Sequence, residues 1–130
     1  PIMRRQGNGV ILTISSIAAI ESYPCVSHKA SKSALLALTQ QLAYQNAEYG
    51  VRANVILPGL MDTPMAVDTR AAAWGRSRED VAQERNARVP LRNKMGSAWD
   101  VAYAALFLAS DESSFCNGGV YLADGGLTAG

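Results

Sequence analysis

The sequence predicts an α/β fold in which parallel strands alternate with helices that cover both faces of a sheet. Two observations carry this prediction. Short runs of apolar and β-branched residues, typical of buried parallel strands, occur at 9–15, 51–57 and 120–122. A long helical pattern separates the first two runs, and such a strand–helix–strand succession implies parallel neighbours joined by a right-handed crossover.

The first expected strand, 9–15, is nearly continuous in apolar residues and follows glycines at 7 and 9. Residues 1–6 are therefore interpreted as the tail of an earlier helix. A strand buried on both faces should have a sheet neighbour at each edge, and no residues before it in this chain can supply one of them. An apolar edge strand left open promotes aggregation.

A long helix is predicted over 27–49, and Gly50 ends it. Two apolar stripes run along it at helical spacing, offset around the axis. The first stripe consists of Ala34, Leu35, Leu38 and Leu42, and the second of Leu36, Ala43 and Ala47. Two stripes indicate two buried faces, so one face is expected on the sheet and the other against a further helix or a second subunit.

The stretch from Leu60 to about Gly96 is polar, rich in arginine and interrupted by prolines. Short helices are expected at 65–73 and 78–87, in a segment whose length is typical of a lid or substrate wall. Trp74 could line a pocket or pack the lid down. A further helix is expected at 98–110, before the last short strand.

Composition excludes several classes of protein. With 48% apolar and 18% charged residues, the 130-residue chain is too hydrophobic for a disordered segment and fits one domain. A net charge of +1 with mixed signs gives no basic stripe for nucleic acid. No apolar run is long enough to cross a membrane. Two distant cysteines and a single histidine do not make a zinc site, so both cysteines are interpreted as free thiols in a reducing cytoplasm, with a disulfide as the alternative.

Four short motifs occur in an order that fits these elements. They are Ile14-Ser15-Ser16, His28-x-x-x-Lys32, Pro58-Gly59 followed by Thr63-Pro64, and Asp124-Gly125-Gly126. Together they resemble the classical short-chain dehydrogenase/reductase family, over essentially all 130 residues. The resemblance implies the C-terminal part of a Rossmann-like, doubly wound parallel sheet with three layers. It also implies that residues 1–130 are the catalytic and substrate half of a domain whose N-terminal, dinucleotide-binding half lies outside this sequence.

The resemblance assigns chemistry to the first two motifs. Ser16, the second serine of its pair, matches the serine that donates a hydrogen bond to the substrate oxygen as negative charge develops there. Lys32 matches the lysine that holds the nicotinamide ribose. It lies four residues after position 28, on the same helix face as the acid–base residue. The plainer alternatives are a serine that caps a strand-to-loop turn and a solvated surface lysine.

Position 28 is where the chain departs from the family, whose acid–base residue is tyrosine. His28 can transfer protons near neutral pH. Imidazole is shorter than phenol, however, so its nitrogen would stop about 1–2 Å short of the substrate oxygen, and a misplacement of this size costs about 10²-fold in rate. We therefore expect impaired catalysis. Tyr23 lies outside the four-residue spacing to Lys32 and does not replace the missing phenol.

The later motifs match the turn that closes over the nicotinamide end of the cofactor, NAD or NADP. By resemblance, Pro58 and Gly59 form the turn, backbone groups of Met61 bind the carboxamide, and the Thr63 hydroxyl binds the carboxamide or a phosphate. Glycine at 59 is expected because a side chain would block approach to the ring. Asn54 and the Asp124 turn are interpreted as architectural.

The resemblance implies an NAD(P)-dependent oxidoreductase that transfers hydride between nicotinamide and an alcohol/ketone substrate, for example a 3-oxoacyl thioester. The alternative is a non-catalytic remnant that keeps the fold and a subunit-pairing surface. We expect a cytoplasmic protein that binds a small-molecule alcohol or ketone, with no nucleic acid, membrane or metal partner. We also expect a homo-oligomer formed through the helix at 27–49.

Overall fold

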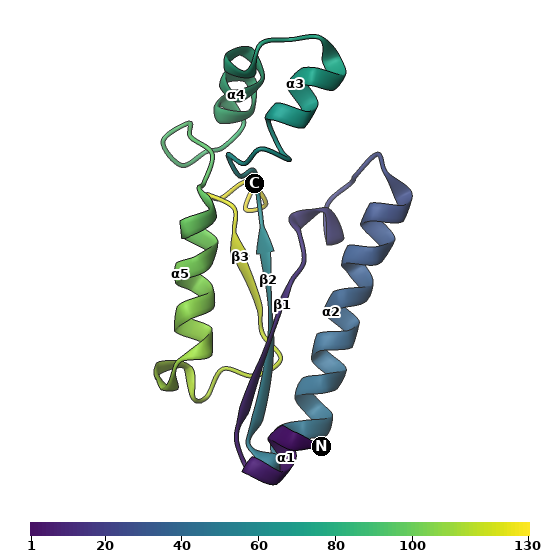
Figure 1. Ribbon diagram of the computed structural model, residues 1–130, viewed down its shortest axis with the longest axis vertical. Helices are drawn as coiled ribbons and strands as arrows, with labels where there is room; N and C mark the ends of the chain where they lie inside the picture. Colours follow the sequence, from purple (N-terminus) through teal and green to yellow (C-terminus); the bar gives the residue numbers. More distant parts are fainter.

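The structure, a computed structural model that describes residues 1–130, is a three-stranded parallel sheet between two helices (Figure 1). Strands and helices alternate as expected. In chain order the elements are α1 (Ile2–Gln6), β1 (Gly9–Ile14), η1 (Ile17–Ala19), α2 (Val26–Asn46), η2 (Ala47–Tyr49), β2 (Val51–Pro58), α3 (Asp68–Trp74), α4 (Arg78–Ala87), α5 (Ala98–Ala109), η3 (Asp111–Ser113) and β3 (Val120–Ala123), where η marks a short 3₁₀ helix.

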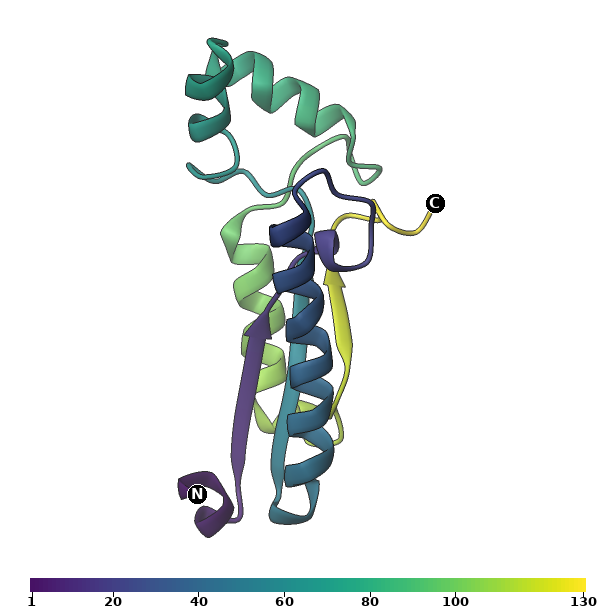
Figure 2. The same ribbon diagram turned by 90° about the vertical axis from the view of Figure 1, so that its right-hand side faces the viewer.

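Strand β2 is the centre of the sheet, whose order is β1-β2-β3. Gly9 pairs with Val51 at one end of the first ladder, and Pro58 pairs with Ala123 at the end of the second. Helix α2 covers one face and α5 the opposite face (Figures 1 and 2). Because β2 is enclosed on both faces and both edges, most of its side chains are fully buried. The prediction of an α/β sheet with helices on both faces is confirmed.

The helix ends follow the local signals in the sequence. α2 ends at Asn46 and continues as one 3₁₀ turn to Tyr49, where Gly50 stops it in the left-handed conformation, with φ at +69°. α4 begins at Arg78 and ends at Ala87, as expected. α3 begins at Asp68 rather than 65, because the N–H groups of Ala66 and Val67 first form a turn with the Thr63 carbonyl.

Strand β1 is paired on one side only and is half-buried rather than buried. Ile14, at its carboxyl end, is exposed. The apolar pattern of this strand therefore predicts more cover than the structure gives it, because its second edge has no partner strand. The helix α1 that precedes it ends at Gly7, in agreement with the interpretation of residues 1–6.

The loop from α5 back to β3 is held against β2 by a buried amide. Asn54 is fully enclosed, donates from Nδ2 to the Cys116 carbonyl at 2.8 Å and accepts at Oδ1 from the Gly119 N–H at 3.0 Å. Asn117 adds a second clamp by accepting from the Ala53 N–H and donating to the Ala43 carbonyl. The architectural interpretation of Asn54 therefore agrees with its contacts.

Helices α3 and α4 stand beyond the carboxyl ends of the strands and have a small core of their own (Figure 1). Its buried members are Ala66, Val67, Ala71, Val81, Val89 and Met95. This separate core lets the segment 60–96, called the lid below, keep its internal shape while resting on the sheet. Trp74 is mostly exposed on it. No helix of the structure has both the length and the apolarity needed to cross a membrane.

The last turn of the chain is built around a buried carboxylate. Asp124 accepts hydrogen bonds from the N–H groups of Gly126 and Thr128 and from the Thr128 hydroxyl. Burial by itself raises the pKa of the Asp124 carboxyl, but these hydrogen bonds outweigh it and leave the pKa below its ordinary value. The ionised form is therefore the one that the fold stabilises.

Replacing Asn54 by leucine should lower the free energy of unfolding by about 2–4 kcal/mol, because the Cys116 carbonyl and the Gly119 N–H lose their partners inside the fold. Urea unfolding followed by circular dichroism measures the change. Asn8→Ala is the matched control, since Asn8 is exposed, and it should stay within about 0.5 kcal/mol of the parent chain. Equal stability of the two variants would contradict the assignment.

Asp124→Asn should lower the melting temperature at pH 7 by roughly 3–5 °C, because charge-assisted hydrogen bonds are replaced by weaker ones. A carboxylate with a lowered folded pKa stabilises fully above its unfolded pKa, near 4, and loses this contribution as the pH falls through the folded value. The gap between variant and parent should therefore shrink from pH 5 toward pH 2.5. A gap that is independent of pH would refute this role.

Candidate functional site

The two serines after β1 are positioned differently by the backbone. Ser15 is buried, and its hydroxyl donates to the Lys32 carbonyl at 2.8 Å. Ser16 begins the turn Ile17–Ala19, where its Oγ accepts from the Ala18 N–H at 3.2 Å. The Ser15 proton is thus used inside the fold, whereas the Ser16 hydroxyl is oriented by the bond it accepts and keeps its own proton to donate.

The loop after Ser16 is tied to the first turns of α2. The Lys29 ammonium donates to the carbonyls of Ala18, Ala19 and Glu21, and the Ser33 hydroxyl donates to the Ala19 carbonyl at 2.8 Å. These bonds hold the strand tip and the helix start in one arrangement. Sequence reasoning missed Lys29, because a lysine beside His28 carries no sign that it binds backbone rather than solvent.

Position 28 and Lys32 lie on successive turns of α2, at the carboxyl end of β1. The Lys32 Nζ donates to the Ile14 carbonyl at 3.3 Å, which leaves its other N–H groups uncommitted. His28 is half-buried and its ring stacks on Tyr23, with centroids 5.0 Å apart and planes tilted by 35°. No hydrogen bond links Ser16, His28 and Lys32 directly, so the backbone alone brings them to this end of the strand.

Cys25, which the sequence analysis interprets as a free thiol, is free in the structure and lies immediately before α2. Its exposed thiol lies within 3.4 Å of the Ser27 hydroxyl. Hydrogen bonds with Ser27, and then with the His28 backbone, lower the pKa of the Cys25 thiol from its ordinary value. Cys116, the second cysteine, is also a free thiol and is half-buried.

The turn after β2 is shaped by its contact with the end of β3. Gly59 donates its N–H to the Ala123 carbonyl at 3.0 Å. A Cβ at position 59 would come within 2.6 Å of the Asp124 Cα and Cβ, so no larger residue fits without moving β3. The immediate reason for glycine is therefore this packing, a contact that the expectation based on approach to a nicotinamide ring did not include.

Beyond Gly59 the chain presents free backbone groups. Met61 pairs with Gly96 as an isolated parallel bridge, in which the hydrogen bonds use the Leu60 carbonyl and the Asp62 N–H. The N–H and C=O of Met61 itself enter no backbone hydrogen bond. Thr63 accepts from the Ala66 N–H at 3.3 Å and keeps its hydroxyl proton free. These groups can receive an amide or a phosphate from outside the fold.

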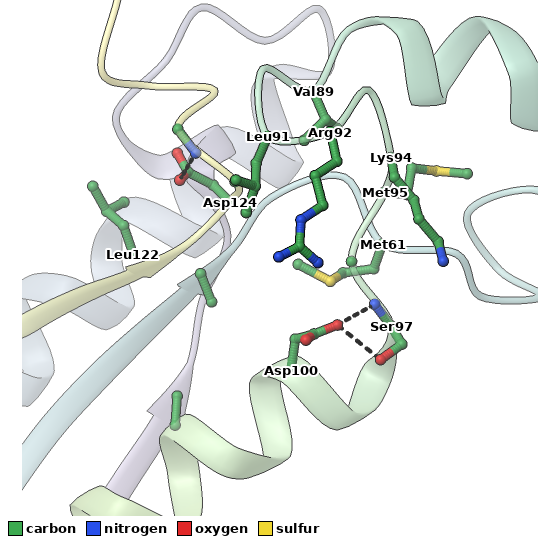
Figure 3. Close-up of a pocket in the computed structure, with 15 residues that line it drawn as sticks. Met61, Val89, Leu91, Arg92, Lys94, Met95, Ser97, Asp100, Leu122 and Asp124 are labelled. Atoms are coloured by element: carbon green, nitrogen blue, oxygen red, sulfur yellow. Dashed lines mark hydrogen bonds between the residues drawn. The ribbon is translucent and has the colours of Figure 1, made fainter.

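Met61 also lines a cavity of about 800 Å³ (Figure 3). It lies between the loop 89–97, the start of α5 and the end of β3, and none of Ser16, His28 and Lys32 lines it. Arg92 extends into it toward Met61 and Asp100 (Figure 3). Both Arg92 and its neighbour Asn93 have left-handed backbones, with φ of +59° and +46°, an unusual conformation for residues other than glycine.

Two acids line this cavity, Asp100 and Asp124, and the hydrogen bonds of Asp124 lie within the last turn of the chain. The Asp100 carboxylate closes a capping box at the start of α5, where it accepts from the Ser97 N–H at 2.6 Å and from the Ser97 hydroxyl at 2.8 Å. The hydrogen bond from the Ser97 N–H has the largest effect and the one from the Ser97 hydroxyl the next largest, and both lower the pKa of the Asp100 carboxyl below its ordinary value. The cavity therefore borders the turn at Met61 without sharing residues with the cluster at the tip of β1.

The geometry thus forms two groups at the carboxyl edge of the sheet, Ser16 with His28 and Lys32 after β1, and Pro58 to Thr63 after β2. A family model described as enoyl-(acyl carrier protein) reductase matches residues 1–128. Among curated relatives, the 2-(R)-hydroxypropyl-CoM dehydrogenase of Xanthobacter autotrophicus is 35% identical over 130 residues, which are 99% of this chain and 49% of that protein.

Solved structures agree with the fold. An oxidoreductase of the short-chain dehydrogenase/reductase family from Burkholderia thailandensis superposes with a TM-score of 0.89 at 33% identity, over 98% of this chain and 48% of that one. An NAD(P)-dependent gluconate 5-dehydrogenase from Beutenbergia cavernae, solved with bound NADP, gives a TM-score of 0.85 at 32% identity, over 98% and 49%. The chain spans about half the length of these proteins. It has the Rossmann-type sheet that they share, and it belongs to the short-chain dehydrogenase/reductase family.

Proposed function

We propose that this chain is the substrate-side, C-terminal half of an NAD(P)-dependent oxidoreductase that interconverts an alcohol and a ketone. The observation that carries the proposal is the shared position of Ser16 and Lys32 at the carboxyl end of β1, with the free backbone groups of Met61 after the next strand. In open α/β sheets this edge is where ligands bind.

Each candidate residue has a role that its contacts support. Ser16, oriented by the Ala18 N–H, donates its proton to the substrate oxygen and stabilises the charge that develops there. Lys32 offers its uncommitted N–H groups to ribose hydroxyls. The Met61 N–H and C=O suit a carboxamide, which has both an acceptor and donors, and the Thr63 hydroxyl suits the carboxamide or a phosphate.

The cofactor proposed is NAD or NADP, of which these residues would hold the nicotinamide end. When bound, the nicotinamide supplies or accepts the hydride. Pro58 and Gly59 set the turn that carries Met61 toward it, and Gly59 keeps this turn against β3. The bound NADP of the Beutenbergia cavernae neighbour supports a nicotinamide cofactor for this chain.

The substrate proposed is a small alcohol or ketone, with a 3-oxoacyl thioester as one candidate. A relative from Thermotoga maritima that is 35% identical over 98% of this chain is a 3-oxoacyl-[acyl-carrier-protein] reductase, which favours the thioester. The lid, with its own core above the strand tips, would form the wall against which such a substrate lies. We propose a reducing, cytoplasmic compartment, in keeping with two free thiols.

His28 at the acid–base position is proposed to impair the reaction. Its imidazole stacks on Tyr23 and has no hydrogen-bonding partner within the chain to orient its nitrogens. An unoriented and short acid is poorly placed to pass a proton to the oxygen that Ser16 would hold.

The second candidate is a non-catalytic member that keeps the fold and associates through its helices. The apolar side chains left exposed on the two covering helices favour it. On α2 these include Leu38, exposed by 52%, and Tyr44, exposed by 84%. On α5 the side chains of Trp99, Tyr103 and Leu106 are mostly exposed, and the ring centroids of Trp99 and Tyr103 lie 6.3 Å apart. Exposed apolar patches of this kind mark association surfaces.

His28→Tyr should raise activity about 100-fold, because phenol restores the missing reach. We would join the chain to the N-terminal half of the Xanthobacter relative and follow oxidation of NADH and NADPH against a panel of ketones. The control is Ser16→Ala in the tyrosine background, which should remove the gain. A tyrosine variant no faster than the histidine parent would overturn our account of position 28, and inactivity of both forms would favour the non-catalytic alternative.

The chain is expected to form homo-oligomers through α2, whose outward stripe includes Leu38. Leu38→Glu should shift sedimentation-velocity profiles toward the monomer, because a buried charge is costly at an apolar interface. Met65→Glu, an exposed apolar position on the lid, is the matched variant and should leave the profile of the parent largely unchanged. A parent chain that sediments as a single monomeric species, or dissociation by Met65→Glu alone, would rule out association through α2.

A further inference from the structure

The lid contains one arginine whose environment the fold does not explain. Arg85, on α4, is only 9% exposed, yet its guanidinium enters no hydrogen bond or salt bridge. Its Nε is completely enclosed and has no partner, the only buried side-chain nitrogen or oxygen in the chain of which this is true. The other two nitrogens retain contact with solvent. Buried cations are normally paired, so this side chain calls for an anion that the chain does not supply.

Three of the five acids of the lid cannot serve as that anion, because other arginines already hold them. Arg78 binds Asp62 at 2.5 Å and Asp68 at 2.7 Å, and Arg76 binds Glu84 at 2.7 Å. The acids at the start of α4 are exposed on its first turn, away from the helix end that carries Arg85.

Arg85 is also close to other unpaired cations. Burial, followed by repulsion from Arg70 and Arg88, lowers the pKa of its guanidinium, and the nearby Tyr23 and Asp62 oppose this shift. Arg70 donates only to the Ala66 carbonyl. Three arginines that enter no salt bridge thus lie within electrostatic range of one another in the lid, and their mutual repulsion costs free energy.

The neighbours of Arg85 lead back to the candidate site. Tyr23 stacks on His28, at the position of the acid–base residue. Asp62 lies between Met61 and Thr63, in the turn after β2. The enclosed guanidinium is therefore within electrostatic range of both segments that border the expected substrate space. Val81, one turn earlier on α4, belongs to the lid core, and it and Arg85 are the two buried residues of this helix, so Arg85 lies on the face that the lid covers.

We propose that Arg85, supported by Arg70 and Arg88, binds an anionic group of the substrate, a carboxylate or a phosphate carried on the molecule that bears the ketone or alcohol. That the ligand is a substrate rests on the proposed oxidoreductase function. That it carries a negative charge rests on the unpaired arginines alone. A guanidinium donates two parallel hydrogen bonds to the oxygens of such a group, which gives both affinity and orientation. The anion would fix one end of the ligand in the lid while Ser16 holds the reacting oxygen.

The test compares matched ketones with and without negative charge on the full 130-residue chain. The pairs are acetoacetate with methyl acetoacetate, and dihydroxyacetone phosphate with dihydroxyacetone, which also separates carboxylate from phosphate. The readout is the NMR resonance of the Arg85 Nε–H group, with affinity from its saturation. At least one anion should shift this resonance saturably and bind about tenfold or more tightly than its neutral partner, the range of a hydrogen bond to a charged group.

Two variants keep the proposal falsifiable. Arg85→Met should weaken anion binding at least tenfold, measured by calorimetry, and should melt no lower than the parent, because an unpaired buried charge is replaced by an apolar chain of similar length. Arg76→Gln, an arginine of the same lid that already has a partner, should change anion affinity less than twofold. Equal binding of charged and neutral ketones, no saturable shift with either anion, or Arg85→Met that melts lower with unchanged affinity would overturn the proposal.

The binding measurements need no cofactor, so they test the anion site independently of the proposed oxidoreductase function. Anion binding at Arg85 without hydride transfer in the joined, tyrosine-restored protein would remove the oxidoreductase function and leave the anion site standing. Hydride transfer that is equally fast with charged and neutral ketones would keep the function and remove the anion site.

Discussion

The arrangement of the candidate site depends on the hydrogen bonds that tie the tip of β1 to the first turns of α2. Lys29 and Ser33 hold the carbonyls of the loop, and Ser15 holds the Lys32 carbonyl. A strand tip and a helix that follows twelve residues later would otherwise be joined only by a flexible loop. With these bonds, Ser16 and Lys32 keep a fixed relation, which is what a preorganised site requires.

Much of the fold could be predicted from sequence because local signals dominated it. Gly50 stops a helix whatever surrounds it, and β2 is apolar because both its faces are covered. In the candidate site, the sequence could predict only the residues that belong to spaced motifs, and not the contacts that they make with distant parts of the chain. Gly59 was assigned to the cofactor side, whereas its nearest constraint is Asp124, 65 residues later. Arg85 gave no signal at all, because an arginine in a polar, Arg-rich segment has the same sequence context whether its charge is paired or not.

The structure divides into a sheet edge that carries the proposed reacting groups and a lid that has its own core. This division separates two kinds of constraint. Residues at the strand tips are bound by backbone hydrogen bonds and tolerate little change, whereas the lid keeps its shape through Val67, Val81 and a few neighbours. Its polar positions can therefore vary with the ligand. A chain without the acid–base phenol at position 28 could still keep a selective pocket, because the proposed anion site and the proposed acid–base position belong to different parts of the molecule.

The contact between Gly59 and Asp124 couples the turn after β2 to the end of the chain. The backbone of this turn lies so close to the last strand that the two segments cannot move independently. Shortening the C-terminus as far as Asp124 would therefore disturb the turn that carries Met61 and Thr63. For the same reason, a graft of the 58–63 turn onto another scaffold would have to carry the terminal strand with it.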